Sequence, residues 1–153
     1  MAAGTWTLYD TAIKKILNAG GSGTTVIPLM TGNLRCRIFK AQAAASVSVF
    51  TLSLLSQIGT TNRAAYMSDY TLSLNTLSVL AGSTTLKFEA NNIVVTASGG
   101  NATSLMYAVV FSSVSAAGGP LLMWCKLSTA AFPVTDTNTL TITAPATGYF
   151  VVY

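Results

Sequence analysis

The side chains that could carry out acid–base chemistry are few and lie far apart in this sequence. The 153 residues include no histidine, and the four carboxylates are spread along the chain: Asp10, Asp69, Glu89 and Asp136. Two of them could meet in space as in a glycosidase, although their spacing does not predict such a pair. The lack of histidine removes the commonest general base and the triads that depend on it. We therefore expect that the protein is not an enzyme and has no catalytic residues.

Each carboxylate also has an ordinary structural interpretation. Asp10 lies near the start of an expected helix, and Asp69 lies just before an expected strand. Glu89 lies at the end of an expected strand, and Asp136 lies in a turn-rich stretch. These are common positions for acidic residues in folded domains.

The two cysteines do not suggest a metal site. Cys36 and Cys125 are too far apart in sequence to form a ligand motif, and no histidine is present to complete one. The segment Ser98–Gly100 lacks the lysine and hydroxyl residue of a phosphate-binding loop. We predict no metal and no cofactor, and two buried thiols in a protein made in a reducing cytoplasm. A disulfide between neighbouring strands remains the alternative.

The composition indicates a surface with few ions. Charged residues are 8% of the chain and hydrophobic residues 51%, whereas charged residues are typically about a quarter. A surface with so few ions tends to associate, so we expect other subunits to cover much of it. The net charge is +4, but the basic residues are scattered and form no stripe with aromatic residues. We expect self-association, with a homotrimer as the predicted state, and no direct contact with nucleic acid.

The mean hydropathy of +0.56 raises the question of a membrane segment. The most apolar long window, 43–58, contains several serines and is shorter than the roughly 20 apolar residues of a spanning helix. The first 17 residues lack the basic start and apolar block of a secretory signal. We therefore predict neither a membrane span nor a secretory signal.

The pattern along the chain favours strands separated by turns. Apolar residues recur at helical spacing most clearly over Leu8–Asn18, with Asp10 or Thr11 near the start as a cap. The window 43–58 is expected to be a connection with a short second helix near Thr51–Ile58. The predicted strands, set apart by Gly-, Pro- and Asn-containing turns, are Thr24–Met30, Arg35–Ala41, Tyr70–Leu74, Thr84–Ala90, Ile93–Ala97, Ser104–Ser112, Leu121–Leu127, Thr139–Thr143 and Tyr149–Tyr153.

Short strands with frequent turns are typical of an all-β domain. We predict a mainly β fold: one domain, 1–153, built as an antiparallel, jelly-roll-like β-sandwich with one N-terminal helix. Thr96–Thr103 is predicted to be the tight link of a hairpin, with Gly99 and Gly100 at positive φ. For any one aromatic residue, we favour a place in the core over a place in an interface.

Several phrases of the sequence, in order, resemble a group of small structural proteins of tailed bacteriophages. They are TWTLYDTAIKKI at 5–16, LKFEANNIVVTASGG at 86–100, TSLMYAVVF at 103–111, GGPLLMWCKL at 118–127 and TDTNTLTI at 135–142. They cover nearly the whole chain. The chain departs from the pattern at Thr103–Ser104 and at Val109–Ser112, where the family's charged residues are missing.

The resemblance implies a virion structural protein, synthesised in the host cytoplasm and located on the capsid surface. The expected role is that of a capsid decoration or cement subunit, whose partner is the major capsid protein. A tail or head-to-tail connector component is the alternative. A more remote alternative is a glycan- or receptor-binding module, although neither Trp6 nor Trp124 lies in a loop that would offer a binding platform.

Overall fold

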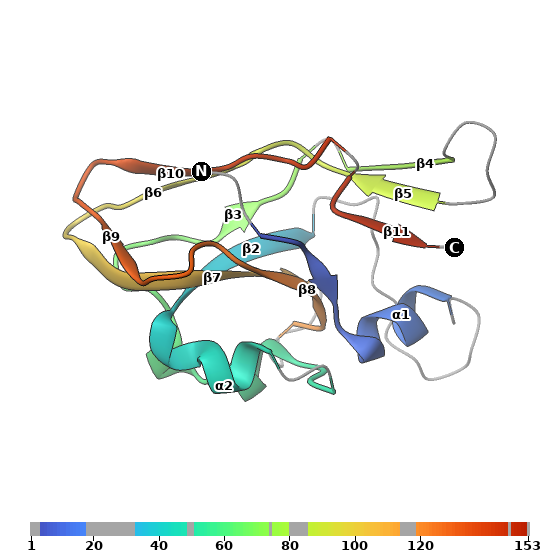
Figure 1. Cartoon of the computed structure of the whole chain (residues 1–153), viewed down its shortest axis with the longest axis horizontal. Coiled ribbons are helices and arrows are strands. Elements are labelled where there is room, and N and C mark those ends of the chain that lie inside the picture. Colours follow the sequence, from blue (N-terminus) through green and yellow to red (C-terminus); the bar gives the residue numbers. More distant parts are fainter. Residues whose placement is uncertain are drawn as a thin grey trace.

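The computed structural model describes residues 4–17, 33–48, 51–73, 75–79, 86–113, 119–146 and 148–152. Antiparallel strands predominate in these ranges, and a single longer helix lies near the N-terminus (Figure 1). The elements are β1 (Thr7–Leu8), α1 (Asp10–Leu17), β2 (Leu34–Lys40), η1 (Ala41–Ala43), α2 (Ala44–Val47), η2 (Leu55–Ile58), η3 (Thr60–Asn62), β3 (Tyr70–Thr71), β4 (Thr76–Val79), β5 (Leu86–Glu89), β6 (Ile93–Thr96), β7 (Ala102–Ser112), β8 (Leu121–Lys126), β9 (Phe132–Val134), β10 (Thr139–Ile142) and β11 (Phe150–Val152).

The largest sheet is built around β7. Its strand order is β1-β8-β7-β2-β3, and β9 also pairs with β7. Every residue from Tyr107 to Ser112 is buried, so this part of β7 is covered on both faces. That explains its continuous apolar sequence, because only a strand exposed on one face alternates between apolar and polar residues.

Two smaller sheets lie over one face of the large sheet. One pairs β10 with β6, and the other has the order β11-β5-β4. In Figure 1 these sheets form an upper layer, while α1 and α2 lie below the large sheet. The prediction of a mainly β fold with antiparallel sheets and one N-terminal helix is therefore confirmed. The two layers face each other as in a sandwich. The strand order does not identify the fold as the jelly roll expected from the sequence.

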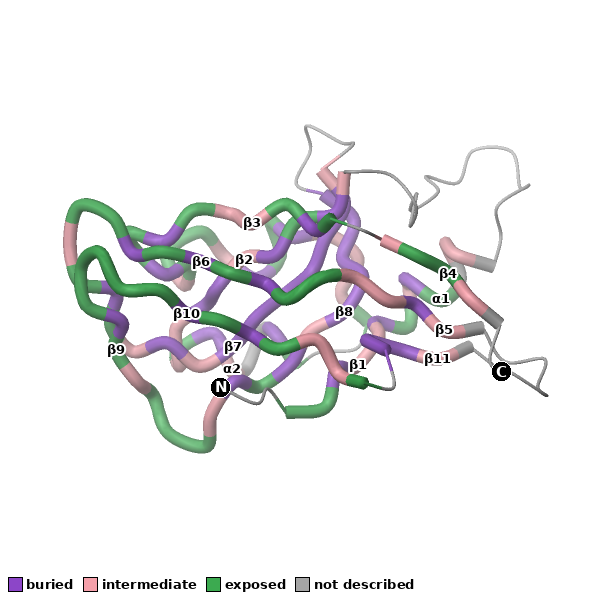
Figure 2. Tube along the Cα trace, turned by 90° about the horizontal axis from the view of Figure 1, so that it is seen from above, coloured by how far each residue is buried: buried purple, intermediate pink, exposed green. Residues whose placement is uncertain are grey.

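The core fills the space between the two layers and beneath the helices. Figure 2 shows the buried residues along the strands of the large sheet, and exposed residues along β6 and β10. The buried hydrophobic residues form one cluster that extends in sequence from Trp6 to Phe150. The largest side chains that are almost fully buried include Tyr9, Phe39, Phe88, Leu105, Leu122 and Met123.

Helix α1 lies where the sequence predicts it, with Asp10 as its first residue. Ala12 is fully buried, whereas Ile13 is 38% exposed. Just before the helix, the buried hydroxyl of Tyr9 donates a hydrogen bond of 2.9 Å to the backbone oxygen of Val47. This bond links the start of α1 to the end of α2.

The predicted hairpin at Thr96–Thr103 is wrong. Strand β6 pairs with β10, and β7 pairs with β2, β8 and β9, so the segment between β6 and β7 connects two different sheets. Gly99 and Gly100 do have the predicted positive φ, at 86° and 154°. The glycines thus indicate that the chain turns here, but they carry no information about which strand β6 will pair with.

Other sequence predictions need smaller corrections. The second helix is a short 3-10 turn, η2, and one turn of α-helix, α2, precedes it outside the predicted range. Strands β1, β4 and β9 were not predicted. They have two to four residues, too few to show a period. The predicted strand Thr24–Met30 and the predicted end of the last strand at Tyr153 lie outside the described residues.

Candidate functional site

Three of the carboxylates have partners that explain their positions. Asp69, just before β3, forms an ion pair with Arg37, and Glu89, the last residue of β5, lies 2.8 Å from the ammonium of Lys87. Asp136 accepts a hydrogen bond of 3.0 Å from the backbone N–H of Gly99. Asp10 is the first residue of α1. All four therefore lie in the structural positions that the sequence predicts.

The two cysteines are buried free thiols on strands β2 and β8. The predicted pair of buried thiols is therefore confirmed, and the alternative disulfide is not formed. Cys36 lies opposite Val110 of β7, and Cys125 lies opposite Ala108 of the same strand, so β7 separates the two thiols. Burial raises the pKa of both thiols, that of Cys36 well above its ordinary value.

Within the described ranges, no three histidine, cysteine, aspartate or glutamate side chains come together as a metal site would require. The same part of the chain contains no helix long and apolar enough to cross a bilayer. Three hollows in the described part of the surface have different linings.

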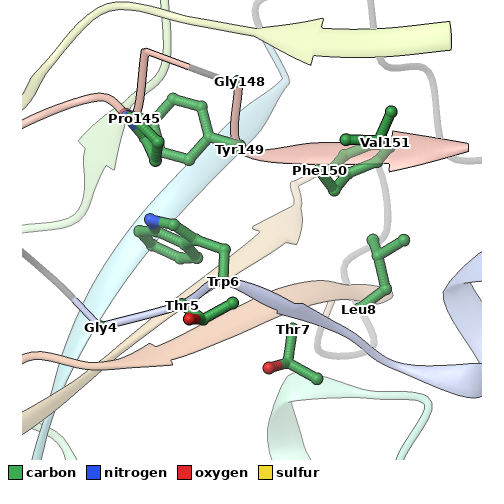
Figure 3. A pocket seen from close by; sticks show the side chains of 10 residues that line it. All are labelled: Gly4, Thr5, Trp6, Thr7, Leu8, Pro145, Gly148, Tyr149, Phe150 and Val151. Carbon is green, nitrogen blue, oxygen red and sulfur yellow. The ribbon is translucent and has the colours of Figure 1, made fainter. Parts of the chain in front are cut away.

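The first hollow is a cleft of about 670 Å³ between β1 and β11 (Figure 3). Its lining comes from Gly4–Leu8 on one side and from Pro145 and Gly148–Val151 on the other. The ring of Trp6 points across the cleft towards Tyr149, and the two ring centroids are 5.3 Å apart. Both rings are more than nine-tenths buried, so they close the inner end of the cleft and belong to the core.

A second feature is the outer face of the two-stranded sheet. Val94 and Thr96 of β6 lie opposite Thr141 and Thr139 of β10, and all four side chains are exposed. We call these four residues the β6–β10 face. A hollow of about 430 Å³ borders it, lined by uncharged residues: Tyr70, Ala90, Asn91, Asn92, Val94 and Ala144. Val94 is 43% exposed and is one of the exposed large hydrophobic residues of the described chain.

The third feature lies at the end of the molecule where β6 turns into β7. Tyr66 has a positive φ of 62° and is 52% exposed, the largest exposure among the described large hydrophobic residues. A hollow of about 560 Å³ beside it is lined by Thr60, Arg63, Ala64, Ala65, Tyr66, Met67, Ser68 and Ser98. We call it the Tyr66 hollow.

No pattern in the sequence separates Tyr66 from the other aromatic residues. Trp6, Tyr9, Tyr107 and Tyr149 are buried, as expected for aromatic residues in general. Tyr66 differs because of its backbone conformation and its neighbour Gly100, which is 34 positions later in the sequence. A contact of that kind cannot be seen in a linear pattern.

Comparison of the chain with protein-family models, with curated proteins and with solved structures finds no match. The function therefore has to be argued from the chemistry of these surfaces and from the sequence motifs.

Proposed function

We propose that this chain is a structural subunit of a tailed-phage virion, a decoration or cement subunit that binds across junctions between major capsid proteins. Its location would be the capsid surface. The observation that carries the proposal is the make-up of the β6–β10 face, whose four exposed residues are one valine and three threonines. The order of the phage-like motifs along the sequence adds support.

A neutral face of this kind suits contact with another protein. Burying Val94 and the threonine methyl groups removes apolar area from water at about 25 cal/mol per Å². The hydroxyls of Thr96 and Thr139 lie 3.1 Å apart and bond to each other, and a hydroxyl oxygen can accept a further hydrogen bond from a partner. The side chains of the face add no ion whose desolvation would have to be offset. A stable contact of standard size needs about 800 Å² from each partner, more than these four residues supply. The neighbouring uncharged surface around Asn91 and Asn92 would extend it.

The proposal also includes self-association, with a trimer as the expected state, because a trimer matches a local three-fold axis of a shell. The low charged fraction of 8% supports it, since few ions oppose close approach of copies. Light scattering of the purified protein at micromolar concentration tests this part. A stable monomer at all concentrations would contradict the trimer but would leave the capsid contact to be tested on its own.

Binding to shells tests the central part of the proposal. Purified protein is added to phage particles that lack it, and the bound amount is measured after sedimentation. We expect Thr141→Glu, on the β6–β10 face, to reduce binding strongly because it places a charge in a neutral contact. The matched control Thr129→Glu changes an exposed threonine between β8 and β9, outside the β6–β10 face, and should bind normally.

Two results would contradict this assignment. If Thr141→Glu binds shells as well as the unchanged protein, the β6–β10 face is not the contact. If the protein instead sediments with isolated tails or connectors, the alternative of a tail or head-to-tail component replaces the cement role. We also expect binding to depend weakly on salt, since the face offers no ion pairs for salt to screen.

A further inference from the structure

The backbone of Tyr66 lies in a conformation that large side chains rarely adopt. A positive φ costs a residue with a Cβ about 1–2 kcal/mol, and such residues are concentrated at functional sites. Two contacts hold Tyr66 in place: its carbonyl accepts a hydrogen bond of 2.9 Å from the N–H of Ser98, and the next residue, Met67, forms a β-bridge with Ala97.

The ring of Tyr66 lies against the backbone of Gly100. A Cβ added to Gly100 would lie 2.8 Å from Cζ of the ring and 3.0 Å from each Cε. Only glycine allows this approach. One side of the ring is therefore supported by the chain, while the residue as a whole remains 52% exposed. The structure thus presents a fixed aromatic ring to solvent.

Polar residues line the Tyr66 hollow together with Tyr66. The exposed hydroxyl residues Thr60, Ser68 and Ser98 line it together with Arg63. The guanidinium of Arg63 is also fixed, since its Nη2 donates to the backbone oxygen of Met67 at 3.3 Å and lies 3.6 Å from a carboxylate oxygen of Asp69. The Arg63 side chain remains 43% exposed, so it can still donate hydrogen bonds to a ligand.

From this arrangement we infer that the Tyr66 hollow is a binding site for a neutral saccharide, with a pyranose ring stacked on Tyr66. A pyranose presents polarised C–H groups on one face, which pack on the electron-rich face of an aromatic ring. Its hydroxyl groups both donate and accept, as do the hydroxyls of Thr60, Ser68 and Ser98. The hollow is open to solvent, and its volume of about 560 Å³ leaves room for one pyranose ring.

The charges in the hollow favour a neutral sugar over a nucleic acid. Binding of single strands needs a positively charged groove that follows the phosphates as well as an aromatic ring. Here the single arginine of the lining is shared with Asp69. This site is separate from the β6–β10 face in its residues, and it can be tested on the isolated protein whether or not the virion role holds.

The test is an NMR titration of the ¹⁵N-labelled protein with three probes: the methyl β-glycosides of glucose, galactose and N-acetylglucosamine. We expect at least one of them to bind with millimolar affinity and to shift the amide signals of residues 60–68 and 98–101. Removing the ring with Tyr66→Gly should weaken that binding at least tenfold. This variant relieves the positive φ, so loss of folding is not expected to confuse the result.

Two control variants sharpen the test. Tyr66→Phe keeps the ring and should bind the same glycoside within a few-fold. Leu77→Ala removes a 38% exposed side chain from β4, and it should leave binding unchanged. The inference is overturned if none of the three glycosides shifts the signals, or if Tyr66→Gly binds as well as the unchanged protein. It is also overturned if a thymidine decamer shifts the same amides at concentrations where the glycosides do not.

Discussion

Arg37 and Asp69 meet through two parallel hydrogen bonds, Nε to Oδ1 at 2.8 Å and Nη2 to Oδ2 at 2.7 Å. Their side chains are only 20% and 14% exposed, and the guanidinium carbon also lies 5.2 Å from the centroid of the Phe111 ring. The pair joins β2 to the segment before β3 and sits on a hydrophobic side chain of β7. This two-point geometry is the strongest form of ion pair in proteins.

We expect Asp69→Asn to destabilise the fold by about 2–3 kcal/mol, because it leaves the largely buried charge of Arg37 without its partner. The free energy of unfolding from urea titration measures the change. The comparison variant is Arg63→Gln, which removes the longer and more exposed contact to Asp69 at 3.6 Å and the hydrogen bond of 3.3 Å to the backbone oxygen of Met67. It should cost about 1 kcal/mol or less, since an exposed ion pair and a long hydrogen bond each contribute little. Equal effects of the two substitutions would mean that the two-point pair has no special role.

A second prediction concerns the contact between Gly100 and Tyr66. Gly100→Ala should destabilise the fold by about 1–3 kcal/mol, since the new methyl group overlaps the ring and the φ of 154° is unfavourable for alanine. In a Tyr66→Ala background the same change should cost less, because the ring is gone. A double-mutant cycle by thermal unfolding measures the difference. Additive effects would show that ring and glycine do not contact each other in solution.

The buried thiols and phenols predict a loss of stability in alkali. Burial raises the pKa of Cys36, Cys125, Tyr9 and Tyr149. These groups keep their protons in the folded state at a pH where the unfolded chain has lost them. The contribution of these four groups to the free energy of unfolding should therefore be constant below about pH 8. It should fall above the ordinary thiol pKa of about 8.5, and more steeply above the tyrosine value of about 10.

Unfolding by urea at a series of pH values measures this dependence. The double variant Cys36→Ala, Cys125→Ala should lose the part of the slope that begins near the thiol pKa and keep the part that begins near that of tyrosine. The expected slope is up to about 1.4 kcal/mol per pH unit for each group. A stability that stays flat to pH 11 would contradict the burial of these groups.

The parts of the fold that could be predicted from the sequence are those with long, regular patterns. Helix α1 has apolar residues at helical spacing, and β7 has an unbroken apolar run, so both were located to within about two residues. The positive φ angles predicted for Gly99 and Gly100 are confirmed. Pairing between strands could not be predicted, because β6 finds its partner β10 more than 40 residues later.

The candidate surfaces were less predictable still. The β6–β10 face depends on the register that places Val94 opposite Thr141, and no local pattern defines that register. The Tyr66 hollow depends on a contact between two loops and on a backbone conformation that tyrosine rarely adopts. The Arg37–Asp69 pair joins residues 32 positions apart, and either could have found another partner.

The most direct test of the proposed cement role is to heat DNA-filled particles made with and without this protein and to record the temperature at which DNA is released. We expect particles without it to release DNA at a lower temperature. Adding the unchanged protein, or the control Thr129→Glu, should restore the higher temperature, whereas Thr141→Glu should not. Equal release temperatures with and without the protein, together with its location on the tail by electron microscopy, would contradict the account.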